Sequence, residues 1–244
     1  MKGRWSRREI IVKSLIATGG AVAAKLSGVV PELRWVAPAA ASPDQAQPPP
    51  YMQKAVRQDE VKGPDAQALL AAVSASADVR EVLGQLSLPA VDLQALGAHA
   101  VRSVLGDGQV VVAVSAVLAD QEHVLAHYQF GAGPRTAAFV YRVTADRKVD
   151  FAAGSADGRA IRRMTEPSNL PANAVLANGC PSCTYSCEVC CGYDWWGILE
   201  CCSFCAALWE CPPCFLACAL TWCSACVWFH CYHCWVCCQD WWCF

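Results

Sequence analysis

Cysteine is missing from residues 1–179 of this 244-residue chain, and no Lys or Arg follows Arg163. Charged residues are also scarce, at 16%, whereas hydrophobic residues make up 55%, which excludes a disordered polyelectrolyte. Because residues 180–244 have no cation to neutralise phosphate groups, we expect no nucleic-acid partner. The chain therefore divides into two parts with different chemistry.

The C-terminal part, residues 180–244, holds all 18 cysteines. An even number of cysteines at this density is typical of a disulfide framework in an oxidising compartment. Bonds between cysteines three or four apart on one helix constrain a chain little, so we expect bonds between helices and different partners for adjacent cysteines. The predicted disulfide cysteines are Cys180, Cys183, Cys187, Cys190, Cys191, Cys201, Cys202, Cys205, Cys211, Cys214, Cys218, Cys223, Cys226, Cys231, Cys234, Cys237, Cys238 and Cys243.

The N-terminus, residues 1–41, combines a basic stretch, a weakly apolar run and a small-residue cleavage site, which together indicate an export signal. Arg7 and Arg8 resemble the arginine pair of a twin-arginine (Tat) signal, so the Tat translocase is an expected partner. An uncleaved membrane anchor is the alternative, but Lys13 and Lys25 interrupt the apolar run. We expect an exported prokaryotic protein, either secreted or held in the cell envelope.

The middle of the chain reads as an α+β domain. Residues 42–63 are polar and Pro-rich and predict an extended linker. From Asp65 to Pro89 apolar residues recur at helical spacing. The period then changes to two, which predicts an antiparallel β-meander. Its strands are expected at 99–105, 109–118, 123–130, 136–144 and 148–154, and the helices should cover one face of the sheet in a domain spanning 64–165.

This domain shows no catalytic residue set. His123 and His127 lie four apart, but no Glu follows the first His as a zinc protease requires. We expect both imidazoles to lie on the surface of a strand. The sequence therefore predicts a protein that is not an enzyme and has no cofactor.

The connector at residues 166–179 carries Pro and Asn between the two parts. Exposed connectors of this kind are where proteases cut. We expect a processing protease to act here, close to Gly179.

The cysteine spacing predicts helices in the C-terminal part. At about 100° per residue, the cysteines from Cys180 to Cys191 fall in one stripe of a helix. A turn at 192–197 and the pair Pro212-Pro213 should divide the segment into a stack of short helices. Residues 211–239 carry no charge when His is neutral and are long enough to cross a bilayer, but the two prolines and the thiol stripe argue against a simple span.

Metal binding is the alternative use of these cysteines, because C-x-x-C pairs recur along the segment. Structural zinc sites normally have two such pairs about 15–20 residues apart with polar surroundings. The segment instead holds eight Trp, four Phe and three Tyr, more aromatic residues than a metal cluster needs. We therefore predict disulfides and no bound metal, with redox-active thiols as a further alternative.

Eight tryptophans cannot all be buried in so short a segment. Exposed Trp with almost no charge is typical of a surface at a membrane interface. We predict membrane contact for Trp195, Trp196, Trp241 and Trp242.

The opening Gly179-Cys-Pro-Ser-Cys183, with the export signal and the hydrophobic, cysteine-rich C-terminal part, resembles precursors of the halocin type of bacteriocin. The resemblance implies that a C-terminal peptide is released by cleavage and that the middle region serves as the producer's immunity protein.

Three functions follow as hypotheses. The leading one is a secreted antimicrobial peptide precursor, in which 64–165 is a pro-domain or immunity domain and 180–244 acts at a target membrane. The second is an exported metal-binding or redox protein that uses the C-terminal cysteines. The third is an envelope protein cross-linked through disulfides.

Overall fold

The structure is a computed structural model that describes residues 52–131, 135–163 and 185–238. All of these belong to one compact unit, Ala46–Phe244. The predicted export signal and the connector at 166–179 lie outside the described residues, together with Arg7, Arg8, Cys180, Cys183, Cys243, Trp241 and Trp242.

The described residues form a nine-stranded sheet in which every neighbouring pair is antiparallel, in the order β1-β2-β3-β4-β5-β6-β7-β9-β8. The strands are β1 (Ala55–Glu60), β2 (His99–Leu105), β3 (Val110–Val117), β4 (His123–Phe130), β5 (Thr136–Val143), β6 (Val149–Ala156), β7 (Arg159–Arg163), β8 (Tyr185–Tyr193) and β9 (Cys231–Cys238). Strands β2 to β6 confirm the predicted meander, with each end within two residues of its expected place.

Strand β1 corrects the part of the predicted linker, 42–63, that falls on residues 55–60. Its side chains are largely exposed, so the strand does not need alternating apolar residues and its sequence does not show them. The strand forms because its backbone pairs with the free edge of β2, and Gln58 Nε2 donates to Ser103 Oγ at 3.1 Å. Backbone pairing at a sheet edge is decided by the neighbouring strand, which composition does not report.

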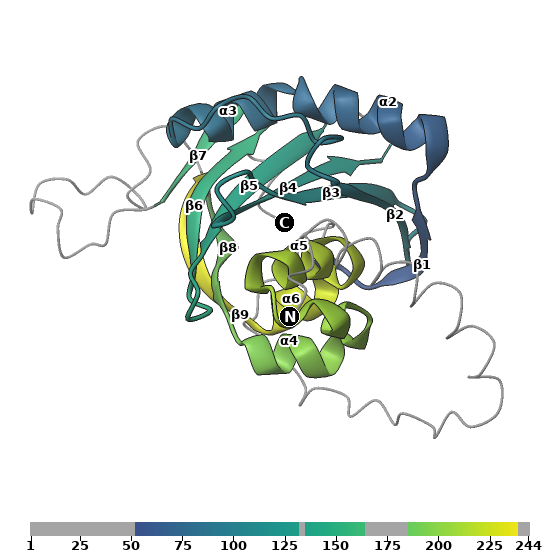
Figure 1. Cartoon of the computed structure of the whole chain (residues 1–244), viewed down its shortest axis with the longest axis vertical. Helices are drawn as coiled ribbons and strands as arrows, with labels where there is room; N and C mark the ends of the chain where they lie inside the picture. Colours follow the sequence, from purple (N-terminus) through teal and green to yellow (C-terminus); the bar gives the residue numbers. More distant parts are fainter. Residues whose placement is uncertain (1–51, 132–134, 164–184, 239–244) are drawn as a thin grey trace, which may run out of the picture. The chain divides into compact units, whose positions relative to one another are not determined.

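Two helices cover one face of the sheet, as predicted (Figure 1). Helix α2 (Gly63–Ser74) has Lys62 at its N-cap, so Asp65 lies in the first turn rather than capping the helix. Ser76 caps helix α3 (Ala77–Gln85) by accepting a hydrogen bond from the backbone N–H of Val79 at 3.2 Å. The buried side chains Leu70, Val73, Val79, Val82 and Leu83 pack on the sheet.

The opposite face of the sheet is covered by the C-terminal helices (Figure 1). These are α4 (Trp195–Cys201), the 3-10 helix η4 (Ser203–Leu208), α5 (Pro212–Trp222) and α6 (Ser224–Phe229). None of the helices in the described ranges has the length and hydrophobicity that a bilayer-spanning helix needs. The predicted class, an α+β domain followed by a disulfide-rich module with helices, is confirmed.

Two segments of the module correct the prediction that it is helical throughout. Residues 185–193 and 231–238 form the strands β8 and β9, which pair with each other around a bulge between Cys190 and Gly192. Strand β9 also pairs with the outer edge of β7. The spacing of the cysteines is compatible with a helix. The unpaired edge of β7, however, offers backbone hydrogen-bond partners to an extended segment, and a helix already satisfies its own backbone groups.

The two parts of the chain share one core. Phe139, Tyr141 and Phe151 of the sheet belong to the same apolar cluster as Phe215 and Leu220 of α5. Residues 64–165 and 180–244, which the sequence treats as separate modules, are therefore joined through their largest apolar side chains.

Candidate functional site

Helix α5 lies at the centre of the candidate site. Pro212 and Pro213 occupy its first positions, where their missing N–H groups cost nothing, and no charged residue occurs in the helix. Every residue from 215 to 221 is buried. A helix that is apolar on all sides is stable in water only when its surroundings cover it. The sheet and the rest of the module supply that cover.

Two polar side chains of the sheet hold α5 by its backbone. Ser115 Oγ donates to the carbonyl oxygen of Ala217 at 2.6 Å, and Tyr128 Oη donates to that of Leu220 at 3.1 Å. Both donors are buried. Burial, with a smaller effect from Tyr141, raises the pKa of Tyr128 well above its usual value, so the hydroxyl stays a neutral donor.

Aromatic rings continue this contact across the sheet. Tyr141 packs edge-on against Phe151 and against Tyr193 of β8, with ring centroids 6.1 and 5.6 Å apart. Trp195 of α4 stacks beside Phe215 of α5 at 5.8 Å. The rings thus connect the sheet, β8 and the helices of the module in one apolar layer.

The turn between β5 and β6 reaches over the module. The Arg147 guanidinium carbon lies 3.8 Å from the centroid of the Trp209 ring, and the Trp195 indole N–H donates to the Arg147 carbonyl. Arg147 has a left-handed φ of 64°, which fixes the direction of this turn. Since residues 180–244 have no Lys or Arg, the sheet domain brings a cation to the face of a module tryptophan.

Six disulfides cross-link the module. All cysteines whose side chains the structure describes take part, with Cα–Cα distances of 5.2–5.9 Å. The bonds are Cys190–Cys231, Cys191–Cys234, Cys201–Cys226, Cys202–Cys223, Cys205–Cys218 and Cys211–Cys214. The adjacent pairs 190/191 and 201/202 reach different partners, as predicted. For Cys187, Cys237 and Cys238 only the backbone is described.

Cys211–Cys214 departs from the expectation that cysteines three apart do not bond each other. Cys211 is the N-cap of α5, with φ −118° and ψ 90°, so its side chain lies outside the helical stripe and meets that of Cys214 in the first turn. The bond closes a loop of only three residues, which constrains the unfolded chain less than the longer loops do.

Two groups of side chains in the module could hold a metal ion in place of disulfides. Cys201, Cys226 and His230 form one group, and Cys202, Cys205 and Cys223 form the other. The ligand atoms within each group all lie within 4.8 Å of one another.

The predicted membrane tryptophans do not behave alike. Trp195 is only 8% exposed and faces the core, which corrects its assignment to the surface, whereas Trp196 is 67% exposed. Sequence reasoning missed three other exposed aromatic residues of the module. We call the exposed set the aromatic rim; it consists of Trp196, Phe204, Phe229 and Tyr232.

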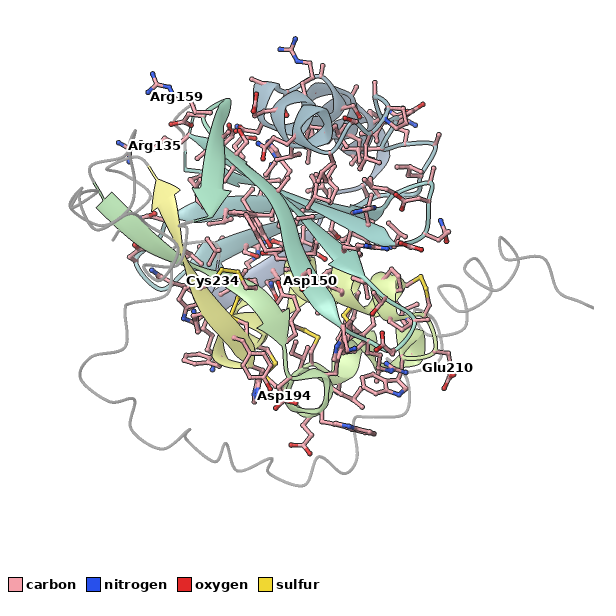
Figure 2. The ribbon with its side chains drawn as sticks, turned by 90° about the vertical axis from the view of Figure 1, so that its left-hand side faces the viewer. Arg135, Asp150, Arg159, Asp194, Glu210 and Cys234 are labelled. Carbon is pink, nitrogen blue, oxygen red and sulfur yellow. A yellow bond between two sulfur atoms is a disulfide. The ribbon has the colours of Figure 1, made fainter. Side chains whose placement is uncertain are left out.

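The labelled charged residues lie at separate places on this unit. Figure 2 shows Asp194 and Glu210 on the outer side of the module, and Arg135 and Arg159 at the far end of the sheet. The same view shows the sulfur–sulfur bonds gathered among the C-terminal elements. The aromatic rim therefore lies on a module whose own charges are acidic or absent.

His127 corrects the expectation of a surface histidine pair. It is 3% exposed, and burial lowers its pKa to about 4, with Asp78 acting in the opposite direction. Asp78 itself accepts hydrogen bonds from Ser155 Oγ at 2.7 Å and from Thr136 Oγ1. His123 stays near the surface, 2.7 Å from an Asp120 oxygen. The two histidines share one face of β4 in the sequence pattern, so only the tertiary structure decides which of them is covered.

Comparison with known proteins finds no matching family model, no matching curated protein and no matching solved structure. The functional argument therefore rests on the chemistry of the site, which is a covered apolar helix, a disulfide framework and an exposed aromatic rim.

Proposed function

We propose that the chain is the exported precursor of a cysteine-rich antimicrobial peptide that acts at target membranes, and that the sheet domain masks this peptide until it is cleaved off. The observation that carries the proposal is the burial of α5. An uncharged helix is covered by a domain that contains no cysteine in its described residues and that precedes it in the chain.

The free energy of burying α5 is large enough to hold the module on the sheet, and no described disulfide links the two parts. Burying Phe215, Leu216 and Leu220 stabilises the contact by about 1.5–3 kcal/mol for each side chain. Much of this burial is against the sheet, so release of the module would uncover α5. Because the six disulfides all lie within the module, they continue to constrain it after separation.

The charge of the module indicates how it would meet a membrane. Its described carboxylates include Asp194, Glu200 and Glu210, and it has no Lys or Arg. Attraction to anionic lipid is therefore not the driving force. Binding would rest on apolar area and on interfacial tryptophans, so it should depend little on salt and on lipid charge.

The test has two parts. The first is the intact mass of protein from culture supernatant, where we expect a fragment that begins near Gly179 and is lighter by two hydrogens for each disulfide. The second is leakage of zwitterionic lipid vesicles, measured before and after cleavage at a protease site engineered between residues 163 and 185. We expect leakage only after cleavage. Export of the intact chain alone, or equal leakage by both forms, would overturn the proposal.

A second candidate is an exported envelope protein that keeps both parts together. The pairing of β9 with β7 and the shared core favour it, because they join the module to the sheet through backbone as well as side chains. Disulfide-linked multimers of intact chain retained in the envelope would support this candidate.

A further inference from the structure

Four cysteines of the module meet between η4 and the C-terminal half of α5. Cys202 and Cys205 lie three apart around the first turn of η4, where a 3-10 helix places such residues on the same side. Cys218 is on α5 and Cys223 directly follows it. We call these four residues the η4–α5 sulfur cluster.

The sulfur positions come close to those of a tetrahedral metal site. The sulfurs of Cys202, Cys205 and Cys223 lie within 4.8 Å of one another, and the sulfur of Cys218 is bonded to that of Cys205. Zinc bound to four thiolates at about 2.3 Å holds the sulfurs about 3.8 Å apart. When the two disulfides are reduced, each bonded pair opens toward this spacing, and the side chain of Cys218, whose sulfur lies outside the group of three, turns toward the other sulfurs. The sequence separations, C-x-x-C and C-x-x-x-x-C, are also those of structural zinc ligands.

The scaffold that positions α5 does not depend on sulfur. Its contacts come from apolar side chains of the sheet and from the hydrogen bonds of Ser115 and Tyr128. Reduction therefore leaves Cys218 and Cys223 in place on the sheet side. The half of the site on α5 is therefore preformed. A metal ion can order the other half, Cys202 and Cys205 at η4, because metal binding and local folding are coupled.

Burial means that these cysteines, once reduced, can carry negative charge only beside a cation. Cys202, Cys205 and Cys218 are 1%, 0% and 7% exposed. Burial disfavours the thiolate form that a metal ion binds unless a cation compensates its charge, and residues 180–244 contain no Lys or Arg to do so. A divalent ion provides that charge at the place where the sulfurs converge.

We propose that the reduced chain binds one Zn²⁺ through the η4–α5 sulfur cluster before its disulfides form. On binding, the four thiols release their protons to solvent. The same sulfurs make Cys202–Cys223 and Cys205–Cys218 in the oxidised chain, so the two states exclude each other. Oxidation removes four electrons, which two molecules of an external disulfide accept with four protons to become four thiols, and Zn²⁺ is released. This proposal does not depend on release of a peptide.

The test uses the full chain, reduced and freed of metal, with and without one equivalent of Zn²⁺. Alkylation with N-ethylmaleimide is then mapped by mass spectrometry of chymotryptic peptides. We expect Zn²⁺ to remove the reactivity of four cysteines, those of the η4–α5 sulfur cluster, and to leave Cys211 and Cys214 reactive. Co²⁺ in place of Zn²⁺ should give the absorption bands of a tetrahedral thiolate site.

Variants make the assignment specific. Cys205→Ser removes a metal ligand and should weaken Zn²⁺ binding by about 100-fold or more. Loss of a residue that only orients a ligand already lowers metal affinity by about 10- to 100-fold. The matched control, Cys211→Ser with Cys214→Ser, removes the local disulfide of α5 and should bind Zn²⁺ as the unmodified chain does. Uniform protection, no protection, protection centred on Cys201 and Cys226, or equal loss in the control would each overturn the proposal.

Discussion

The two faces of the sheet are covered in different ways. On one face α2 and α3 pack through aliphatic side chains, and a buried carboxylate, Asp78, is satisfied by hydroxyl and backbone donors. On the other face the helices are apolar, carry large aromatic rings and are cross-linked by disulfides. The first face therefore contains a buried His127 and Asp78 that make it sensitive to acid, whereas the cross-links of the second make it sensitive to oxidation state.

The largest effect should come from the face that holds the module. Phe215→Ala removes a fully buried ring from the contact of α5 with Trp195 and the sheet, and should destabilise the chain by about 3–5 kcal/mol. Chemical denaturation followed by Trp fluorescence reports this directly, because eight of the ten tryptophans lie in residues 180–244. Leu83→Ala on the opposite face is the control. If it disturbed hydrogen exchange in the module as much as Phe215→Ala did, the two faces would not be independent.

The next effect distinguishes long disulfide loops from short ones. Replacing Cys202 and Cys223 by Ser opens a loop of 21 residues and should cost about 3 kcal/mol, whereas replacing Cys211 and Cys214 should cost about 2 kcal/mol. Thermal unfolding of the oxidised proteins gives both values. Equal losses would show that the disulfides act through local strain rather than through the unfolded chain.

A smaller effect should appear on the α2–α3 face as the pH falls. Because burial lowers the pKa of His127 to about 4, the unfolded chain takes up a proton on this residue between pH 6.5 and 4 while the folded chain does not. Stability is therefore full above pH 6.5 and falls as pH decreases. The loss at pH 5 is about 2 kcal/mol. His127→Leu should flatten the dependence of unfolding free energy on pH over this range, and an unchanged slope would contradict the assignment.

The smallest effect tests one hydrogen bond between sheet and module. Ser115→Ala removes the donor to the Ala217 carbonyl and should cost about 1 kcal/mol. The corresponding change on the other face is Ser155→Ala, which removes a donor to the Asp78 carboxylate and should cost about 1.5–3 kcal/mol. Both are measured by denaturant unfolding. A larger loss for Ser115→Ala would show that α5 depends on this donor more than on apolar packing.

The meander was predictable because its strands carry their own signal. In β4 the alternation places Val124, Ala126 and Tyr128 on one face of the sheet and Leu125 and His127 on the other. The turns between consecutive strands are short, which leaves only antiparallel pairing. Strands β1, β8 and β9 were not predictable in the same way. Strands β1 and β9 lack a regular alternation of apolar and polar residues, and the cysteine spacing of β8 also fits a helix. Each of the three forms because another strand presents an unpaired edge.

The candidate site was predictable in its chemistry and not in its geometry. The run of cysteines and aromatic residues in 180–244 indicated cross-linking and exposed rings. Nothing in the run Trp195-Trp196 shows that the first ring is buried and the second exposed. The buried position of Trp195 goes with the hydrogen bond from its indole N–H to the Arg147 carbonyl in the turn between β5 and β6. The partner of each cysteine likewise depends on the fold.

The sequence alone determined a cysteine-free α+β domain, a cation-free module rich in cysteine and tryptophan, and the boundary between them, because composition and short-range period are local properties. Only the tertiary structure decided that the module lies on the sheet, that four sulfurs converge beside α5, and that His127 is buried. These depend on contacts between residues far apart in the chain, where packing and backbone pairing outweigh local preference.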